Sequence, residues 1–296
     1  MSGARAIGAL DRSAPPIIWA MRYAVDLGNS AAKVGWLENG ARRSIRMAAP
    51  SGRISAAAWY PHIASLLDLA FSEGGGSDTL TFASVVPAAA EALRTLAAER
   101  AIGVHEITAI DVPLKIALDA PERLGVDRAL GAWRAYATWG APQGRGAIAV
   151  TLGTALTLTC VTRAGAIIGG AIAPSPVLAA RALAVGTAAL PEITLFDESP
   201  DLPGPVGATT DSAIAAGILR GARATLAALV EESAKEMGRR DPGAPRPAIV
   251  LAGGAATAGW SAGVEADARE TELVLDAILA LAVGSAPTTS VPKGPR

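Results

Sequence analysis

A short polar turn follows the first β-rich run of the chain, and its residue types suit phosphate and metal binding. The run ends at Asp26 and is followed by Gly28, Asn29, Ser30 and Lys33. Glycine lets backbone N–H groups converge on an anion, because no Cβ blocks the approach. The carboxylate is an oxygen ligand of the kind that Mg²⁺ prefers, and the lysine adds positive charge. A plain turn is the competing interpretation.

A second copy of this pattern occurs later in the chain. Residues 23–40 and 148–165 align at a fixed offset, with VDLG of the first copy facing VTLG of the second. The turn of the second copy consists of Gly153, Thr154 and Ala155. The copies differ most where the first has Asp26 and the second has Thr151. Threonine keeps a hydroxyl but supplies no negative charge, so we expect the second copy to bind a cation more weakly.

A third candidate is the acid in PERLGVDR, residues 121–128. Gly125 precedes Asp127 and Arg128 near the start of a predicted helix. In the functional interpretation Asp127 is a general base that takes a proton from a substrate hydroxyl. In the structural interpretation it is an acid favoured by the helix dipole. Taken alone, the residues Val-Asp-Arg at 126–128 favour the structural interpretation.

Paired glycines occur twice after apolar runs. Gly169 and Gly170 lie in IGGAIAP, and Gly253 and Gly254 lie in LAGG, where the backbone can pass under an adenine ring. A ligand that lies close to the backbone and a tight turn both explain such pairs. Thr210 follows another threonine just before a predicted helix, and helix capping explains that pattern.

Composition excludes several classes of function. The formal net charge of −1 gives no electrostatic case for nucleic acid or an anionic membrane as partner. Cys160 is the only cysteine, so an intrachain disulfide and a thiolate metal site are both excluded. The two histidines lie in unrelated contexts, and no GxSxG motif or GxxxxGK[ST] loop is present. We expect a cytoplasmic protein, without an uninterrupted apolar run of about 18 residues.

Strand and helix signals alternate along the chain and predict an α/β fold in two halves that begin with the same hairpin. Strands are predicted at 79–86 and 248–254 beside the hairpins at 23–37 and 148–161, and helices at 87–100, 121–139, 176–186, 211–237 and 264–283, with a loop at 239–247. The predicted domains are 21–143 and 144–284, between a disordered N-terminal extension (1–20) and a disordered tail (285–296).

The order of these motifs resembles that of the type III pantothenate kinases. The matching segments are DLGNS, ASVVP, PERLGVDR, TLGTALT, IGGAIAP, TTDSAIAAG and LAGG, which span about 23–255. The Asn29, Ser30 and Lys33 variant resembles the subgroup of Bordetella accessory-factor-like proteins. The resemblance implies two duplicated actin-like (ribonuclease H-like) domains with ATP in the cleft between them. It also implies a homodimer that phosphorylates pantothenate with Mg²⁺ and a monovalent cation, K⁺ or NH₄⁺.

The resemblance also implies roles for individual residues. Asp127 matches the catalytic base, and Gly125 and Arg128 lie beside it near pantothenate. The ATP site comprises Asp26, Gly28, Asn29, Ser30, Lys33, Gly153, Thr154, Ala155, Gly253 and Gly254. Gly169 and Gly170 close the substrate side, and Thr210 reaches pantothenate across the dimer. The metal residues are Asp26 and, with weakened affinity, Thr151.

The chain departs from the family pattern at several positions. Thr151 replaces the acid of the family's DxGTA motif, and Ile116 and Leu118 replace its Asn-x-Tyr. Ser175 replaces the last glycine of the GGxIxPG pattern. Two hypotheses follow: an ATP-dependent pantothenate kinase of impaired activity, or a repurposed relative that binds nucleotide without phosphorylating pantothenate. A third hypothesis is a sugar or acid kinase, because these kinases belong to the same superfamily as the pantothenate kinases.

Overall fold

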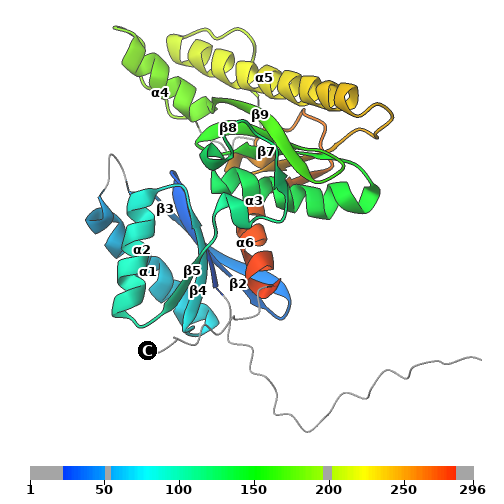
Figure 1. The fold of residues 1–296 in the computed structure, drawn as a ribbon. Coiled ribbons are helices and arrows are strands. Elements are labelled where there is room, and N and C mark those ends of the chain that lie inside the picture. The colour runs from blue at the N-terminus through cyan, green and yellow to red at the C-terminus, as the bar shows by residue number, and fades with distance from the viewer. Residues whose placement is uncertain (1–22, 51–54, 196–201, 285–296) are drawn as a thin grey trace, which may run out of the picture.

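The computed structural model describes residues 23–50, 55–195 and 202–284. Both predicted disordered ends, 1–20 and 285–296, lie outside these residues. The described chain forms two β-sheets with helices between them and on their outer faces (Figure 1). This arrangement confirms the predicted α/β fold in two halves.

The first sheet has the strand order β3-β2-β1-β4-β5. Its strands are β1 (Tyr23–Leu27), β2 (Ala31–Glu38), β3 (Ala41–Ala48), β4 (Thr79–Ser84) and β5 (Gly103–Glu106). β1, β2 and β3 pair antiparallel, whereas β4 lies parallel to β1 and β5 parallel to β4. The predicted hairpin at 23–37 is therefore confirmed.

The second sheet repeats this topology and has one additional strand. Its strands are β6 (Lys115–Ile116), β7 (Ala147–Leu152), β8 (Ala155–Val161), β9 (Ala166–Pro174), β10 (Ala248–Ala252) and β11 (Ala268–Glu270). The order β9-β8-β7-β10-β11 matches the first sheet strand for strand, with the same parallel and antiparallel pairings, and β6 adds to β9 at the edge. The repeated hairpin is thus part of a repeat of the whole sheet.

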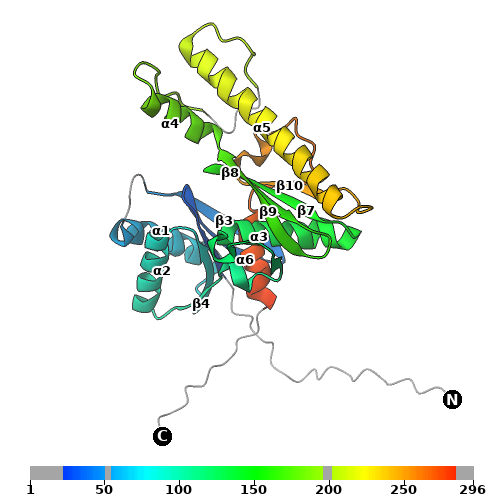
Figure 2. The same ribbon diagram turned by 45° about the horizontal axis from the view of Figure 1, so that its top comes forward.

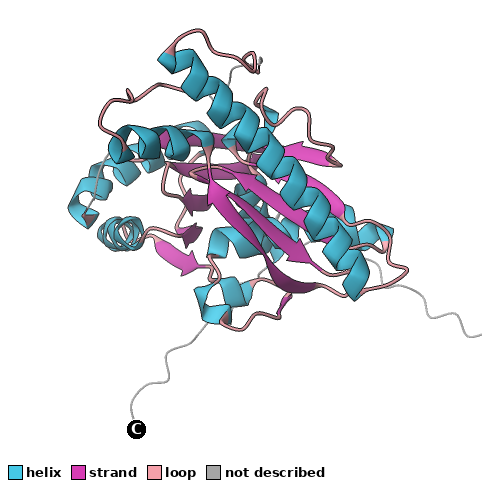
Figure 3. Cartoon of the chain, turned by 90° about the horizontal axis from the view of Figure 1, so that it is seen from above, coloured by secondary structure: helices cyan, strands magenta, loops and turns pink. Residues whose placement is uncertain are grey.

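Helices divide the molecule into layers. The α-helices are α1 (Ala56–Gly74), α2 (Pro87–Glu99), α3 (Val126–Ala135), α4 (Pro176–Gly186), α5 (Thr210–Arg240) and α6 (Leu273–Gly284). Between the two sheets, α3 and α6 share one apolar core with both of them. α1 and α2 cover the outer face of the first sheet, and α5 crosses the outer face of the second (Figure 3).

Alternation along the first strand of each sheet decides which side chains face the middle layer. Tyr23, Val25 and Leu27 pack against α1 and α2, so Asp26 faces the opposite way, toward α3 and α6. In β7, Ile148 and Leu152 pack on the α5 side. Thr151 then faces the same middle layer as Asp26, and the two positions that distinguish the repeats lie on facing walls.

Two predicted helices differ from the structure. The helix at 121–139 is divided into a 3₁₀ turn at Pro121–Arg123, α3, and a π-helix at Tyr136–Gly140, with Gly125 as the N-cap of α3. The predicted helix at 264–283 is wrong in its first part, because β11 pairs there with β10 before α6 begins. Further 3₁₀ turns lie at Ala109–Asp111, Ala141–Gln143 and Gly254–Thr257.

α5 is longer than predicted and ends at Arg240, inside the predicted loop. Among the described helices it alone is long and apolar enough to cross a membrane, by length and composition only. Leu226, Val230 and Ala234 nevertheless pack in the core of the second sheet. The Arg223 side chain also donates hydrogen bonds to the Trp260 and Gly259 carbonyl oxygens, so this helix is held against the fold.

Candidate functional site

A cavity of about 740 Å³ lies between the two repeated hairpins. Its volume is within the range of pockets that hold small molecules and cofactors. It is lined by every residue predicted for phosphate, metal or proton-transfer chemistry, namely Asp26, Gly28, Asn29, Ser30, Lys33, Asp127, Thr151, Gly153, Thr154, Ala155, Gly253 and Gly254. The structure therefore brings these residues to one place, while their roles in binding stay predictions.

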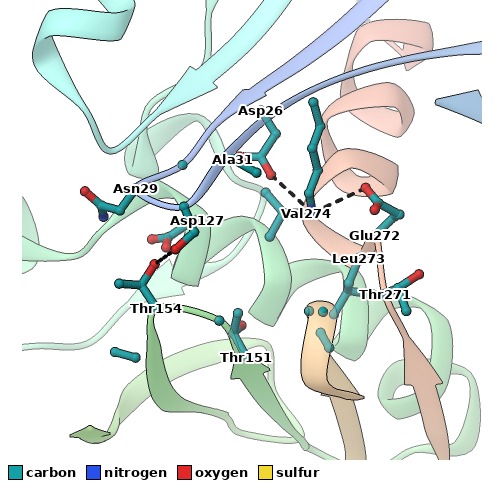
Figure 4. A pocket seen from close by; sticks show the side chains of 18 of the residues that line it. Asp26, Asn29, Ala31, Asp127, Thr151, Thr154, Thr271, Glu272, Leu273 and Val274 are labelled. Carbon is teal, nitrogen blue, oxygen red and sulfur yellow. Dashed lines mark hydrogen bonds and ion pairs between the residues drawn. The ribbon is translucent and has the colours of Figure 1, made fainter. Parts of the chain in front are cut away.

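The two glycine turns contact each other across this cavity. The hydroxyls of Ser30 and Thr154 form a hydrogen bond that joins the first turn to the second (Figure 4). The first turn is one residue longer, because Leu27 pairs with Ala32 whereas Leu152 pairs with Leu156. The fixed offset of the sequence alignment therefore fails after the turns.

The corrected register changes the counterpart of Lys33. Asp26 is paired with Lys33 across the first hairpin, and Thr151 is paired with Thr157 across the second. Thr157 also lines the cavity and was missed by the sequence analysis. An acid and a base on one wall thus face two hydroxyls on the other.

The Lys33 ammonium lies between the carboxylates of Asp26 and Glu272, which Figure 4 labels at the ends of two dashed lines. It lies 3.3 Å from Glu272 Oε2 and 4.0 Å from Asp26 Oδ2, and all three side chains are largely buried. Burial raises the pKa of Asp26 to about 6, against the attraction of Lys33 and with further repulsion from Asp127 and Glu272. This carboxyl is costly to ionise without an additional cation.

Asp127 lies in the first turn of α3 and lines the cavity with its carboxylate. Its Oδ1 accepts a hydrogen bond from the backbone N–H of Arg128 at 2.8 Å. This contact at the start of the helix agrees with the structural interpretation of Asp127. Burial raises the pKa of Asp127 above its ordinary value, although this bond and the Arg128 charge oppose the shift. A raised pKa makes the carboxylate a stronger proton acceptor, which is what a general base needs.

The Arg128 side chain does not line the cavity and is bound to β8. Its guanidinium donates to Thr159 Oγ1 and to the Leu158 carbonyl oxygen, both at 3.2 Å. Gly170 is paired with Thr159 inside β9, where an added Cβ would lie 1.9 Å from Leu158 O. The glycine pair at 169–170 therefore belongs to a strand, and the close packing of β8 against it requires a glycine there.

The remaining substrate-side residues lie outside the cavity lining as well. Gly125 is the N-cap of α3, two residues before Asp127. Thr210 is the first residue of α5 and is exposed, while Thr209 is the residue that caps this helix. The expected contact of Thr210 with pantothenate in the partner subunit stays a prediction.

Gly253 allows the backbone to approach the second turn closely. It has φ +92°, and an added Cβ would lie 2.6 Å from Leu152 O. Its N–H donates to the Glu270 carbonyl oxygen at 3.1 Å, which connects the end of β10 to β11. Both the backbone conformation and the contact require glycine at this position.

Several lining residues were missed by the sequence analysis. They are Ala31, Arg46, Val85, Thr157, Leu195, Ala252, Thr271, Glu272, Leu273 and Val274. Glu272 precedes α6, whose first turn reaches the cavity from between the sheets. Glu270 and Glu272, two acids separated by one residue, are a possible signal in the sequence. The predicted helix over 264–283 places both of them in its interior.

The residues present fit a magnesium ion that arrives with a nucleotide. Asp26 and Asp127 offer carboxylate oxygens, the ligands that Mg²⁺ prefers, and the raised pKa of Asp26 marks a carboxyl whose charge lacks compensation. Within the described ranges, no group of three or more His, Cys, Asp or Glu side chains could hold a metal by itself. One or two protein carboxylates plus substrate phosphates are the usual set for Mg²⁺ in nucleotide sites.

Two repeated α/β halves with a cleft between their glycine turns define the actin-like class of fold. Residues 23–232 match the profile of the type III pantothenate kinases. The chain belongs to the type III pantothenate kinase family. It is therefore a member of a family of kinases, as its motif order predicted.

Individual relatives agree with this assignment. The chain is 29% identical to a type III pantothenate kinase of Sphingopyxis alaskensis, over 88% of this chain and 97% of that protein. It is 32% identical to type III pantothenate kinase 1 of Symbiobacterium thermophilum, over 80% and 87%. Among solved structures, ethanolamine utilization protein EutJ from Carboxydothermus hydrogenoformans has a TM-score of 0.51 at 14% identity, over 90% and 91%, and supports the fold alone.

Proposed function

We propose that this protein phosphorylates pantothenate with ATP to give 4′-phosphopantothenate, the first step of coenzyme A biosynthesis. The observation that carries the proposal is the Asp127 carboxylate in a cavity shared with both glycine turns, in a chain of this family. The names of the relatives supply the substrate. A sugar or acid kinase gains no support from them.

The lining residues divide the work of the reaction. Asp127 accepts the proton of the primary hydroxyl of pantothenate. The hydroxyl oxygen forms a bond to the γ-phosphorus of ATP, and the bond from this phosphorus to the β–γ bridging oxygen breaks, which releases ADP. The N–H groups and hydroxyls of the turns bind the phosphates, which take the place of the contact between Ser30 and Thr154. Asp26 would hold Mg²⁺, which neutralises phosphate charge.

Thr151 leaves the wall of the cleft formed by β7 and β8 without a carboxylate at this position. It is paired with another threonine and faces the same layer as Asp26, so only hydroxyls are available there. The proposed kinase is therefore slower than one with an acid at this position. The resemblance to the family also implies a monovalent cation, K⁺ or NH₄⁺, as a further cofactor. A repurposed nucleotide-binding relative is the alternative function, and the cytoplasm is the proposed location.

Thr151→Asp tests this reading of the second wall. We expect the added carboxylate to raise kcat for pantothenate phosphorylation about tenfold or more, because one electrostatic partner at an active site contributes about 10²–10³. The measurement is ATP consumption by purified protein with pantothenate, with and without Mg²⁺ and K⁺. If folded wild-type protein and folded Thr151→Asp both bind ATP yet turn over no pantothenate, the kinase proposal is wrong and the alternative function stands.

An exposed apolar face supports the proposed homodimer. Val177, Leu178 and Val185 of α4 are 49%, 43% and 81% exposed. α4 and the first part of α5 extend away from the sheets (Figure 2). Thr210 begins α5 at this end, so a second copy seated on this face would receive Thr210 near its own site. Apolar surface of this kind is typical of interfaces between subunits.

Val185→Asp tests the dimer. We expect the charged side chain to convert a dimer to a monomer at micromolar concentration, because an unpaired carboxylate in an apolar interface is costly to bury. Light scattering coupled to size-exclusion chromatography measures the mass of each variant. Val104→Asp, on β5 at the other end of the molecule, is the control and should leave the mass unchanged. A wild-type monomer would contradict the proposal.

A further inference from the structure

The charged side chains that line the cleft do not neutralise the negative charge of a polyphosphate. Asp26, Asp127 and Glu272 are three carboxylates among the lining residues, against the two cations Lys33 and Arg46. A triphosphate therefore enters a cleft of net negative charge, and each cation that is free to bind it has a large effect on affinity.

Lys33 is not free in this sense. Its ammonium already lies beside Glu272 at 3.3 Å and Asp26 at 4.0 Å, with little exposure to water. A phosphate that binds Lys33 must compete with both carboxylates. Among the described residues, Arg46 is the lining cation that has no carboxylate within ion-pair distance.

The position of Arg46 directs it to the phosphate side of the cleft. Arg46 on β3 is paired with Lys33 on β2, which in turn is paired with Asp26 on β1. Side chains of directly paired residues extend on the same face of a sheet, so the three form a row along one wall. The end of β3 is also tied to the first turn, because the Ala49 N–H donates to the Ser30 carbonyl oxygen at 3.0 Å.

The facing wall has no equivalent of this cation. The corresponding row of the second sheet is Thr151, Thr157 and Ile172, which are paired in the same way and carry no charge. The guanidinium group binds phosphate oxygens with two parallel hydrogen bonds and stays protonated at all relevant pH values. Among the described lining residues, the positive charge for the phosphates therefore comes from the first wall.

We infer that Arg46 is a further binding residue for the nucleotide and contacts its terminal phosphate. This inference rests on the proposed function, because it takes a nucleoside triphosphate as the occupant of the cleft. It assigns specificity for a triphosphate over shorter nucleotides to one side chain on β3. The Lys33 ammonium, held by two carboxylates, then serves mainly to offset their charge.

The test is calorimetric titration of Arg46→Ala and wild-type protein with ATP, ADP and AMP, each with Mg²⁺. We expect the Kd of ATP to rise about tenfold to a hundredfold, because a charge-assisted hydrogen bond is lost. The Kd of AMP should stay unchanged, and Arg46→Lys should recover part of the ATP affinity. Arg43→Ala is the matched control, because Arg43 lies on the same strand but on its opposite face, and is paired with Glu38.

The outcomes separate the inference from the proposed function. Wild-type protein that binds ATP no more tightly than folded Arg46→Ala overturns the inference alone. A variant with unchanged ATP affinity and a raised KM for pantothenate overturns it too, because Arg46 then contacts the substrate carboxylate. Wild-type protein that binds none of the nucleotides overturns both the inference and the proposed function.

Discussion

Asp127→Asn is expected to lower kcat for pantothenate phosphorylation by about 10²–10⁴, the usual contribution of a general base. Asparagine keeps the shape of the side chain, and its oxygen can still accept the Arg128 N–H bond that Asp127 makes. It cannot accept the hydroxyl proton. The Kd of ATP should therefore change little, and the measurement is steady-state turnover combined with an ATP titration.

The pH dependence gives a second readout for the same residue. Burial raises the pKa of Asp127, so the rate should fall as the pH drops through that raised value, where the base becomes protonated. The surface variant Asp68→Asn is the control, because Asp68 is 62% exposed and its partner is Arg100. Full activity in Asp127→Asn would contradict the assignment of this residue as the base.

Asp26→Asn is expected to lower turnover by about 10²–10³ while making the protein more stable at pH 8. The first effect follows from losing the carboxylate that would hold Mg²⁺. The second follows from the pKa of about 6 for buried Asp26, against 3.8 for the same group unperturbed. That difference corresponds to roughly 2–3 kcal/mol of folding free energy.

The sign of the stability effect depends on pH. Between pH 4 and pH 6 the folded state holds a proton on Asp26 that the unfolded state has released, so wild-type stability falls as the pH rises through this window. Asparagine has no such proton. Urea denaturation of both proteins should show a difference at pH 8 that disappears near pH 4. An equal difference at both pH values would show that Asp26 ionises without cost.

Some of the site could be predicted from local sequence alone. The strand pattern of Tyr23, Val25 and Leu27 already places Asp26 on the opposite face, and paired glycines mark the places where backbones approach. The repeat between the hairpins followed from the same local signals. Lys33 was also identified from the sequence, as a positive charge close to the first glycine turn.

Other parts required the folded chain. The extra residue in the first turn changes the partner of each position after it, so a fixed offset could not identify Thr157 as the counterpart of Lys33. Arg46 was missed because the polar run of β3 has no clear apolar alternation at the sequence level. Glu272 was missed because the start of α6 was placed too early.

The amino-acid sequence by itself determined the repeated hairpins, the glycine turns and the difference between Asp26 and Thr151, because these depend on neighbours in the chain. Only the tertiary structure decided which charges meet. α6 returns between the sheets, and Glu272, directly before this helix, lies 3.3 Å from Lys33. Electrostatic interactions depend on distance and burial, and both are set by how the two halves pack rather than by order along the chain.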